Sequence, residues 1–147
     1  MDAAIFRDRP HLPRTQIERT RRLMDEAIDD AMVVGYEPLI ETIALLDADD
    51  RHVLAAAIHC RACVIVTANL RDFPRDILAL HGLEAQHPDG FILERFKASP
   101  HEVVGALNRL RRALKKPPMT PALLLAAMLR QGLTASAEAL SSFIDAL

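Results

Sequence analysis

Hydrophobic residues recur along the chain at two spacings. Residues 13–31 follow the period of an amphipathic helix, and residues 49–60 predict a second helix with acids in its first turn and an almost wholly apolar body, as in a buried helix. The β-branched runs at 31–36 and 63–67 predict buried strands, and a weaker strand is expected at 83–88. Pro74 begins a short predicted helix that ends before Gly82.

The alternation of strands and helices predicts an α/β fold with parallel strands joined by helical crossovers. After about residue 90 the pattern becomes wholly helical. Ser99, Thr120 and Thr134 stand where helix N-caps are expected, and Gly132 marks a helix end. We therefore predict an α/β domain over residues 1–98 and a helical C-terminal extension over 99–147, with residues 116–119 as a linker inside the extension.

The composition of the chain excludes several classes of function. The 147 residues include 18 basic and 20 acidic ones, which give a net charge of −2 and exclude nucleic-acid capture by bulk charge alone. The first ten residues lack the pattern of a signal peptide, and the longest apolar runs are too short to span a bilayer. Two cysteines suggest no disulfide framework, so we expect a cytoplasmic protein without a membrane partner.

Two polar clusters carry candidate chemistry. Asp47, Asp49 and Asp50 precede the buried helix, and the run Thr67 to Asp72 follows the clearest strand. In a parallel sheet both positions lie at the carboxyl edge, where open α/β folds place their sites. Oxygen ligands that converge there suit Mg²⁺ or Mn²⁺. The alternative is that the acids cap helices and the second cluster is an ordinary turn.

These residues also carry a resemblance to a known family. The segments DADDRHVLAAAI, CVIVTANLRDFP and LEAQHPDGF resemble the C-terminal half of a PIN domain, in particular the VapC-type toxin ribonucleases of toxin–antitoxin systems. The likeness covers about residues 14–95. It implies a PIN-like three-layer fold, in which helices flank a parallel sheet, and a metal-dependent endoribonuclease that hydrolyses RNA phosphodiesters with Mg²⁺ or Mn²⁺. It also implies an RNA substrate and a cognate antitoxin.

The resemblance also implies roles for individual residues. Asp50 and Asp72 would be the catalytic metal ligands, and Asp47 and Asn69 would assist in holding the metal. Thr67 would support the site through its hydroxyl, and Arg51 or Arg71 would bind RNA phosphates. Apart from the resemblance, His52 stands near Asp50 in the predicted helix, where it would support the site by bonding a ligand carboxylate; the alternative is an ordinary polar packing role.

One family feature is missing from the sequence as it stands. PIN domains begin with an apolar strand that ends in Asp, and no such pattern precedes Pro10, so the acidic set and the α/β part look N-terminally shortened. An exposed sheet edge of this kind predicts a homodimer or higher oligomer, through strand exchange or a shared sheet. The alternative function is a catalytically incomplete PIN-fold module that self-associates or binds an antitoxin.

Two further features have ordinary interpretations. Cys60 and Cys63 form a C-x-x-C pair beside His59, but there is no second pair, so we expect a structural role. The basic run over residues 109–116 lies at the end of a predicted helix and reads as a solvated face. A surface for RNA or an antitoxin is the alternative, and a helical nucleic-acid adaptor built on this run is a third candidate function.

Overall fold

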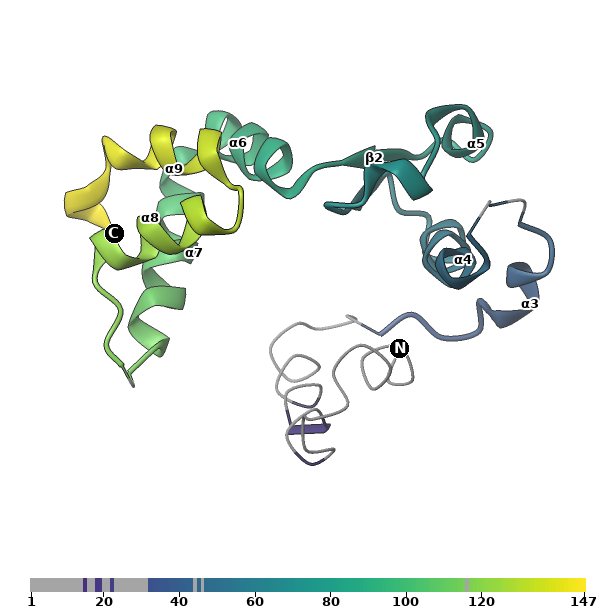
Figure 1. Cartoon of the computed structure of the whole chain (residues 1–147), viewed down its shortest axis with the longest axis horizontal. Helices are drawn as coiled ribbons and strands as arrows, with labels where there is room; N and C mark the ends of the chain where they lie inside the picture. Colours follow the sequence, from purple (N-terminus) through teal and green to yellow (C-terminus); the bar gives the residue numbers. More distant parts are fainter. Residues whose placement is uncertain are drawn as a thin grey trace.

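The structure is a computed structural model that describes residues 15, 18, 19, 22, 32–43, 45, 47–115 and 117–147. The predicted helix over 13–31 lies almost wholly outside these residues. The described part is α/β, with many helices and one small sheet (Figure 1). Helices α6 to α9 gather at one end of the picture, and α3, α4, α5 and the sheet lie toward the other.

The first group of elements contains the sheet. Strands β1 (Val64–Val66) and β2 (Glu84–Gln86) pair in parallel, with Ile65 opposite Ala85, as the strand–helix–strand order predicted. The helices of this group are short, and two of them are 3₁₀ turns: α3 (Glu37–Ile40), η1 (Ala48–Asp50), α4 (Arg51–His59), η2 (Leu70–Asp72) and α5 (Arg75–Ala79).

A first hydrophobic core holds this group together. Leu54 and Ala55 of α4 are wholly buried, and small alanine side chains let α4 approach its neighbours closely. Around them lie further buried side chains from α4 itself, the loops, α5 and the sheet: Ile43, Leu45, Ala57, Ile65, Phe73, Leu78 and Leu83. The apolar body of the predicted helix at 49–60 is thus confirmed as a buried element.

Two predictions about the sheet are wrong. Residues 32–36 form no strand, and Val34 is 71% exposed, because no described strand lies beside this segment to complete its backbone hydrogen bonds. Strand β1 is buried on one face alone: Ile65 is buried, whereas Val66 is 44% exposed. Cys63, expected to begin a buried strand, is also exposed.

The second group consists of helices α6 (Pro88–Ala98), α7 (Pro100–Ala113), α8 (Pro121–Arg130) and α9 (Thr134–Ser141), followed by the 3₁₀ turn η3 (Ile144–Ala146). They share a second core. Phe96 of α6 meets Phe143 edge to face there, with 5.3 Å between ring centroids. The boundary between residues 98 and 99 stays a prediction. None of the helices in the described ranges has the length and apolar character needed to cross a membrane.

The N-terminus of α9 is capped from a distance. Thr134 was predicted as its N-cap but is its first helical residue, so that prediction is wrong. The carboxylate of Asp89, on α6, instead accepts hydrogen bonds from the amides of Ala135 (2.9 Å) and Ser136 (2.8 Å). The buried Ser136 hydroxyl in turn donates to the Asp89 carbonyl at 2.9 Å. These bonds tie the start of the second group to its last helix.

The basic run at the end of α7 is divided in the structure. Arg111 is part-buried, and its guanidinium donates to the carbonyls of Leu147 (2.8 Å) and Met119 (3.0 Å) and to the Asn108 side chain. The interpretation of the run as a solvated face is therefore wrong for Arg111, which links α7 to two later segments. Arg109 and Arg112 are exposed.

Candidate metal centre

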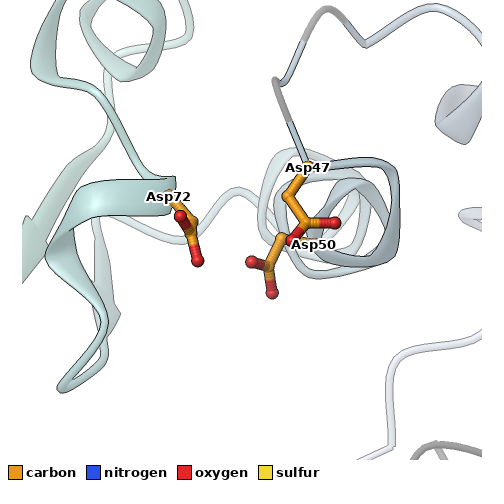
Figure 2. Close-up of side chains that lie close together, drawn as sticks. All are labelled: Asp47, Asp50 and Asp72. Atoms are coloured by element: carbon orange, nitrogen blue, oxygen red, sulfur yellow. The ribbon is translucent and has the colours of Figure 1, made fainter.

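Three aspartates lie together at the carboxyl end of β1. One carboxylate oxygen from each of Asp47, Asp50 and Asp72 lies within 4.8 Å of the other two. Figure 2 shows the carboxylates of Asp50 and Asp72 facing one another, with Asp47 beside Asp50 at the start of α4. The predicted convergence of the two polar clusters therefore occurs in the structure.

The turn before α4 sets the first two carboxylates. Asp47 is the N-cap of η1, and its side chain accepts a hydrogen bond from the amide of Asp49 at 2.8 Å, an Asx turn typical of Asp. Asp50 follows as the N-cap residue of α4, but its side chain makes no capping hydrogen bond. The carboxylate of Asp50 is thus directed toward Asp72 and away from the helix amides.

The loop after β1 sets the third carboxylate. The Thr67 hydroxyl accepts a hydrogen bond from the amide of Asn69 at 3.0 Å, which shapes the turn as the strand ends. The side-chain amide of Asn69 then donates to Oδ2 of Asp72. Asn69 and Thr67 therefore position Asp72. The sequence analysis did not predict this contact, although a spacing of three residues between Asn69 and Asp72 permits it.

The site concentrates negative charge. The pKa of Asp50 is raised, first because partial burial disfavours its charged form, and then because the carboxylates of Asp47 and Asp72 repel it. A hydrogen bond with Asp72 adds to this effect, and His52 opposes it weakly. A bound cation would relieve the repulsion that the two neighbouring carboxylates exert on Asp50.

The donor set fits a hard divalent cation. Mg²⁺ and Mn²⁺ prefer carboxylate and water oxygens, and Mg–O bonds of about 2.1 Å place ligand oxygens about 3 to 4 Å apart. The three oxygens already lie near that range. Asp47 is exposed and the other two are half-buried, so water has access to complete a coordination shell.

The other predicted site residues lie in different environments. The His52 ring contacts the carbonyl of Asp49 through Nδ1, so its hydrogen bond is to the backbone. Arg51 donates from Nε and Nη2 to the carbonyl of Leu45, at 3.4 and 3.2 Å, and fastens the loop before η1. Arg71 is exposed in η2, directly before Asp72. No motif in the sequence predicts the contact between Arg51 and Leu45.

Parts of the chain match a known protein family and a curated relative. Residues 88–142, from the start of α6 to the end of α9, match the family model described as the VapC50 C-terminal domain. The chain resembles the VapC-type proteins. Over 98 residues it is 40% identical to a curated Mycobacterium tuberculosis protein named "Putative ribonuclease VapC50". The alignment covers 67% of this chain and 57% of that protein, so the chain spans little more than half the length of this relative. No solved structure matches the chain significantly.

Proposed function

We propose that the protein is a metal-dependent endoribonuclease of the VapC type, the toxin of a toxin–antitoxin system, which hydrolyses RNA phosphodiesters at the cluster of Asp47, Asp50 and Asp72. The observation that carries the proposal is the meeting of these three carboxylates at the carboxyl edge of a parallel sheet. The name of the Mycobacterium tuberculosis relative supports the reaction type.

The roles of the residues follow from their contacts. Asp47, Asp50 and Asp72 would hold Mg²⁺ or Mn²⁺. Such an ion supplies an activated water and neutralises charge on the reacting phosphate. Asn69 would keep Asp72 in place through its amide and contribute to the metal site from there, and the Thr67 hydroxyl would fix the turn.

Two arginines and a histidine complete the proposed machinery. Arg71 is exposed beside Asp72, where its guanidinium can meet an RNA phosphate. Arg51 would act chiefly by holding the loop before η1, because its hydrogen bonds go to the Leu45 carbonyl, and its remaining donors would serve RNA. His52 would support Asp50 through its nearby charge.

The wider setting is also a proposal. We infer a PIN-like three-layer fold for the α/β part, which the parallel strands and the helices around them support. The division into an α/β domain over 1–98 and a helical extension over 99–147 stays a prediction. The expected partners are RNA, a cognate antitoxin and further copies of the chain in a cytoplasmic complex. The exposed Val66 on β1 supports self-association, because an exposed apolar side chain can be buried against another copy of the chain.

Cleavage of a labelled single-stranded RNA tests the proposed activity. We expect cleavage with Mg²⁺ or Mn²⁺ and none in chelator. The substitution Asp50→Asn removes a ligand charge and should abolish cleavage, whereas Asp76→Asn changes an exposed acid of α5 outside the cluster and should preserve it. Equal cleavage in chelator, or equal loss in both variants, would contradict the metal site.

The second candidate is a binding module that keeps the scaffold without catalysis. The observation in its favour is that the Asn69 amide already occupies one oxygen of Asp72, which leaves less of that carboxylate for a metal. Calorimetric titration with Mn²⁺ separates the two functions. The nuclease requires binding that Asp50→Asn removes, and the binding module predicts no heat beyond that of dilution in either protein.

A further inference from the structure

A cavity lies between α5, the turn η2 and strand β2. Helix α5 packs beside β2 there (Figure 1), and η2, the turn that carries Asp72, forms part of the wall. The volume is about 350 Å³, within the range of small-molecule binding sites. The apolar residues that line it in the described part of the chain are Leu70, Phe73, Pro74, Leu78 and Ala85. A ligand held in this cavity would therefore lie next to the turn that carries Asp72.

Two charged side chains of opposite sign also line the cavity. Arg75 is the first residue of α5 and Glu84 is the first residue of β2, and both are exposed. The Arg75 guanidinium supplies a planar set of N–H donors. Oε1 of Glu84 accepts one hydrogen bond from the side-chain amide of Gln86 at 2.8 Å, which leaves further lone pairs of that carboxylate for a ligand. The cavity thus combines apolar walls with one strong donor group and one strong acceptor group.

The backbone of Ala85 adds a second donor and acceptor. The amide of Glu84 donates to the Cys63 carbonyl at 3.1 Å, and the Gln86 carbonyl accepts from the amide of Thr67 at 2.9 Å, so both neighbours of Ala85 face β1. In a parallel pair the residue between them directs its N–H and C=O toward the opposite edge. No described strand lies beside that edge of β2. The cavity that Ala85 lines can therefore offer these backbone groups to a ligand.

We propose that this cavity binds a guanine base of the RNA substrate, beside the phosphate at the metal site. The proposal rests on the proposed nuclease function and adds a base specificity to it. A nucleobase has two apolar faces and a polar rim, and it is read in proteins through that rim while its faces lie against apolar or aromatic side chains. The apolar residues of the cavity, with the exposed Leu70 at 43%, would contact the faces of the base.

The two charges select guanine among the four bases. Guanine carries two adjacent donors, N1–H and the N2 amino group, which match the two oxygens of a carboxylate such as Glu84. It also carries two adjacent acceptors, O6 and N7, which match the paired donors of a guanidinium such as Arg75. Adenine, cytosine and uracil each lack such a pair of adjacent donor groups, so a carboxylate gains less from them. Glu84 therefore determines the base preference, and Arg75 strengthens it.

Fluorescence anisotropy with the full chain in chelator tests the base preference without any cleavage. The probes are labelled short oligouridylates that carry one central guanosine or one central adenosine. Repulsion between the acidic cluster and the RNA backbone is the same for both probes, so the ratio of their dissociation constants depends on the base alone. We expect the guanosine probe to bind about tenfold more tightly than the adenosine probe.

Two substitutions change the proposed contacts. Glu84→Gln replaces one of the two acceptors by a donor, which suits the N6 and N1 atoms of adenine, so the preference for guanosine should fall about tenfold. Arg75→Gln should weaken binding of the guanosine probe by about tenfold. Glu102→Gln and Arg112→Gln make the same chemical changes at exposed positions of α7, outside the cavity, and should leave the preference unchanged. All four side chains are exposed, so circular dichroism should show unchanged folding.

Several results would overturn the proposal. They are equal affinity for the two probes, a guanosine preference that survives Glu84→Gln, and binding of free guanosine monophosphate tighter than that of the guanosine probe, which would indicate a mononucleotide site. Cleavage with Mn²⁺ that shows no preference for guanosine would contradict the cavity and leave the nuclease intact. A guanosine preference in chelator without cleavage in Mn²⁺ would support the cavity and contradict the nuclease.

Discussion

We expect the carboxylate of Asp89 to stabilise the helical group (α6 to α9), although Asp89 is partly exposed to solvent. Replacement of Asp89 by alanine removes the acceptor for two amides at the start of α9, those of Ala135 and Ser136. No local side chain replaces it, because Leu133 occupies the N-cap position. The α9 N-terminus would then rely on water for these amides, while the buried Ser136 hydroxyl keeps its bond to the Asp89 carbonyl.

The magnitude follows from comparable interactions. Loss of a good N-cap costs about 1–2 kcal/mol, and hydrogen bonds to a charged acceptor lie at the upper end of the usual range. The Asp89 carboxylate caps two amides but remains partly exposed to solvent, so we expect Asp89→Ala to cost about 2 kcal/mol. Asp89→Asn retains one acceptor oxygen and should cost about half as much.

The pH dependence gives an independent measurement. Partial burial alone would raise the pKa of Asp89, but hydrogen bonds from Ser136 and Ala135 outweigh burial and lower it. The stabilisation is therefore present above the pKa of the unfolded state, about 3.9, and is lost as the pH falls through the lower folded value. Urea denaturation followed by circular dichroism should show a gap between wild type and Asp89→Ala at pH 7 that narrows below about pH 4.

The control for this comparison is Asp76→Ala, which removes an exposed acid from the first turn of α5 and should cost about 0.5 kcal/mol or less. A cost for Asp89→Ala no greater than that of Asp76→Ala would refute the long-range cap. A gap that stays constant through acid pH would refute the role of the charge.

Three further predictions concern charge, a part-buried arginine and backbone conformation. Asp50→Asn should raise the melting temperature of the metal-free protein, because it removes carboxylate repulsion, and Mn²⁺ should then stabilise wild type but not the variant in thermal scans. Arg111→Met should cost about 2 kcal/mol in urea denaturation, since three acceptors lose their donor, and an equal cost for the exposed Arg112→Met would contradict this. Gly132→Ala should cost about 1 kcal/mol by the same measurement, because Gly132 has a φ of +78°; an unchanged stability would contradict that strain.

Local patterns predicted several of the described elements and the place where the acidic residues meet. The apolar run around Ile65 predicted β1. Thr120 before Pro121 predicted the start of α8, where the Thr120 hydroxyl accepts a hydrogen bond from the amide of Leu123. Asp50 and Asp72 meet because a helix start and a strand end share one edge of a parallel sheet. These predictions depend on neighbours in sequence or on a general rule of topology.

What the sequence could not predict depends on contacts between distant residues. Asp89 caps a helix more than forty residues away, and nothing near Pro88 indicates which helix it will meet. The basic run predicts Arg111 to be a solvated cation, but its acceptors are the carbonyls of Leu147 and Met119, which come from later segments of the chain. Likewise, the pattern at 31–36 is apolar enough for a strand, but a strand also needs a partner, and no described strand supplies one.

A single residue separates the sheet from the helical group. Strand β2 ends at Gln86 and α6 begins at Pro88. His87 lies between them as the N-cap of α6, and its ring nitrogen Nδ1 accepts a hydrogen bond from the amide of Asp89 at 3.2 Å. The match to the VapC50 C-terminal domain also begins at residue 88. Recombination at this joint would exchange one helical module for another and leave both hydrophobic interiors closed. For gene fusion, position 87 is therefore a better junction than the predicted boundary at 98–99, which would separate Phe96 from the rest of the second core.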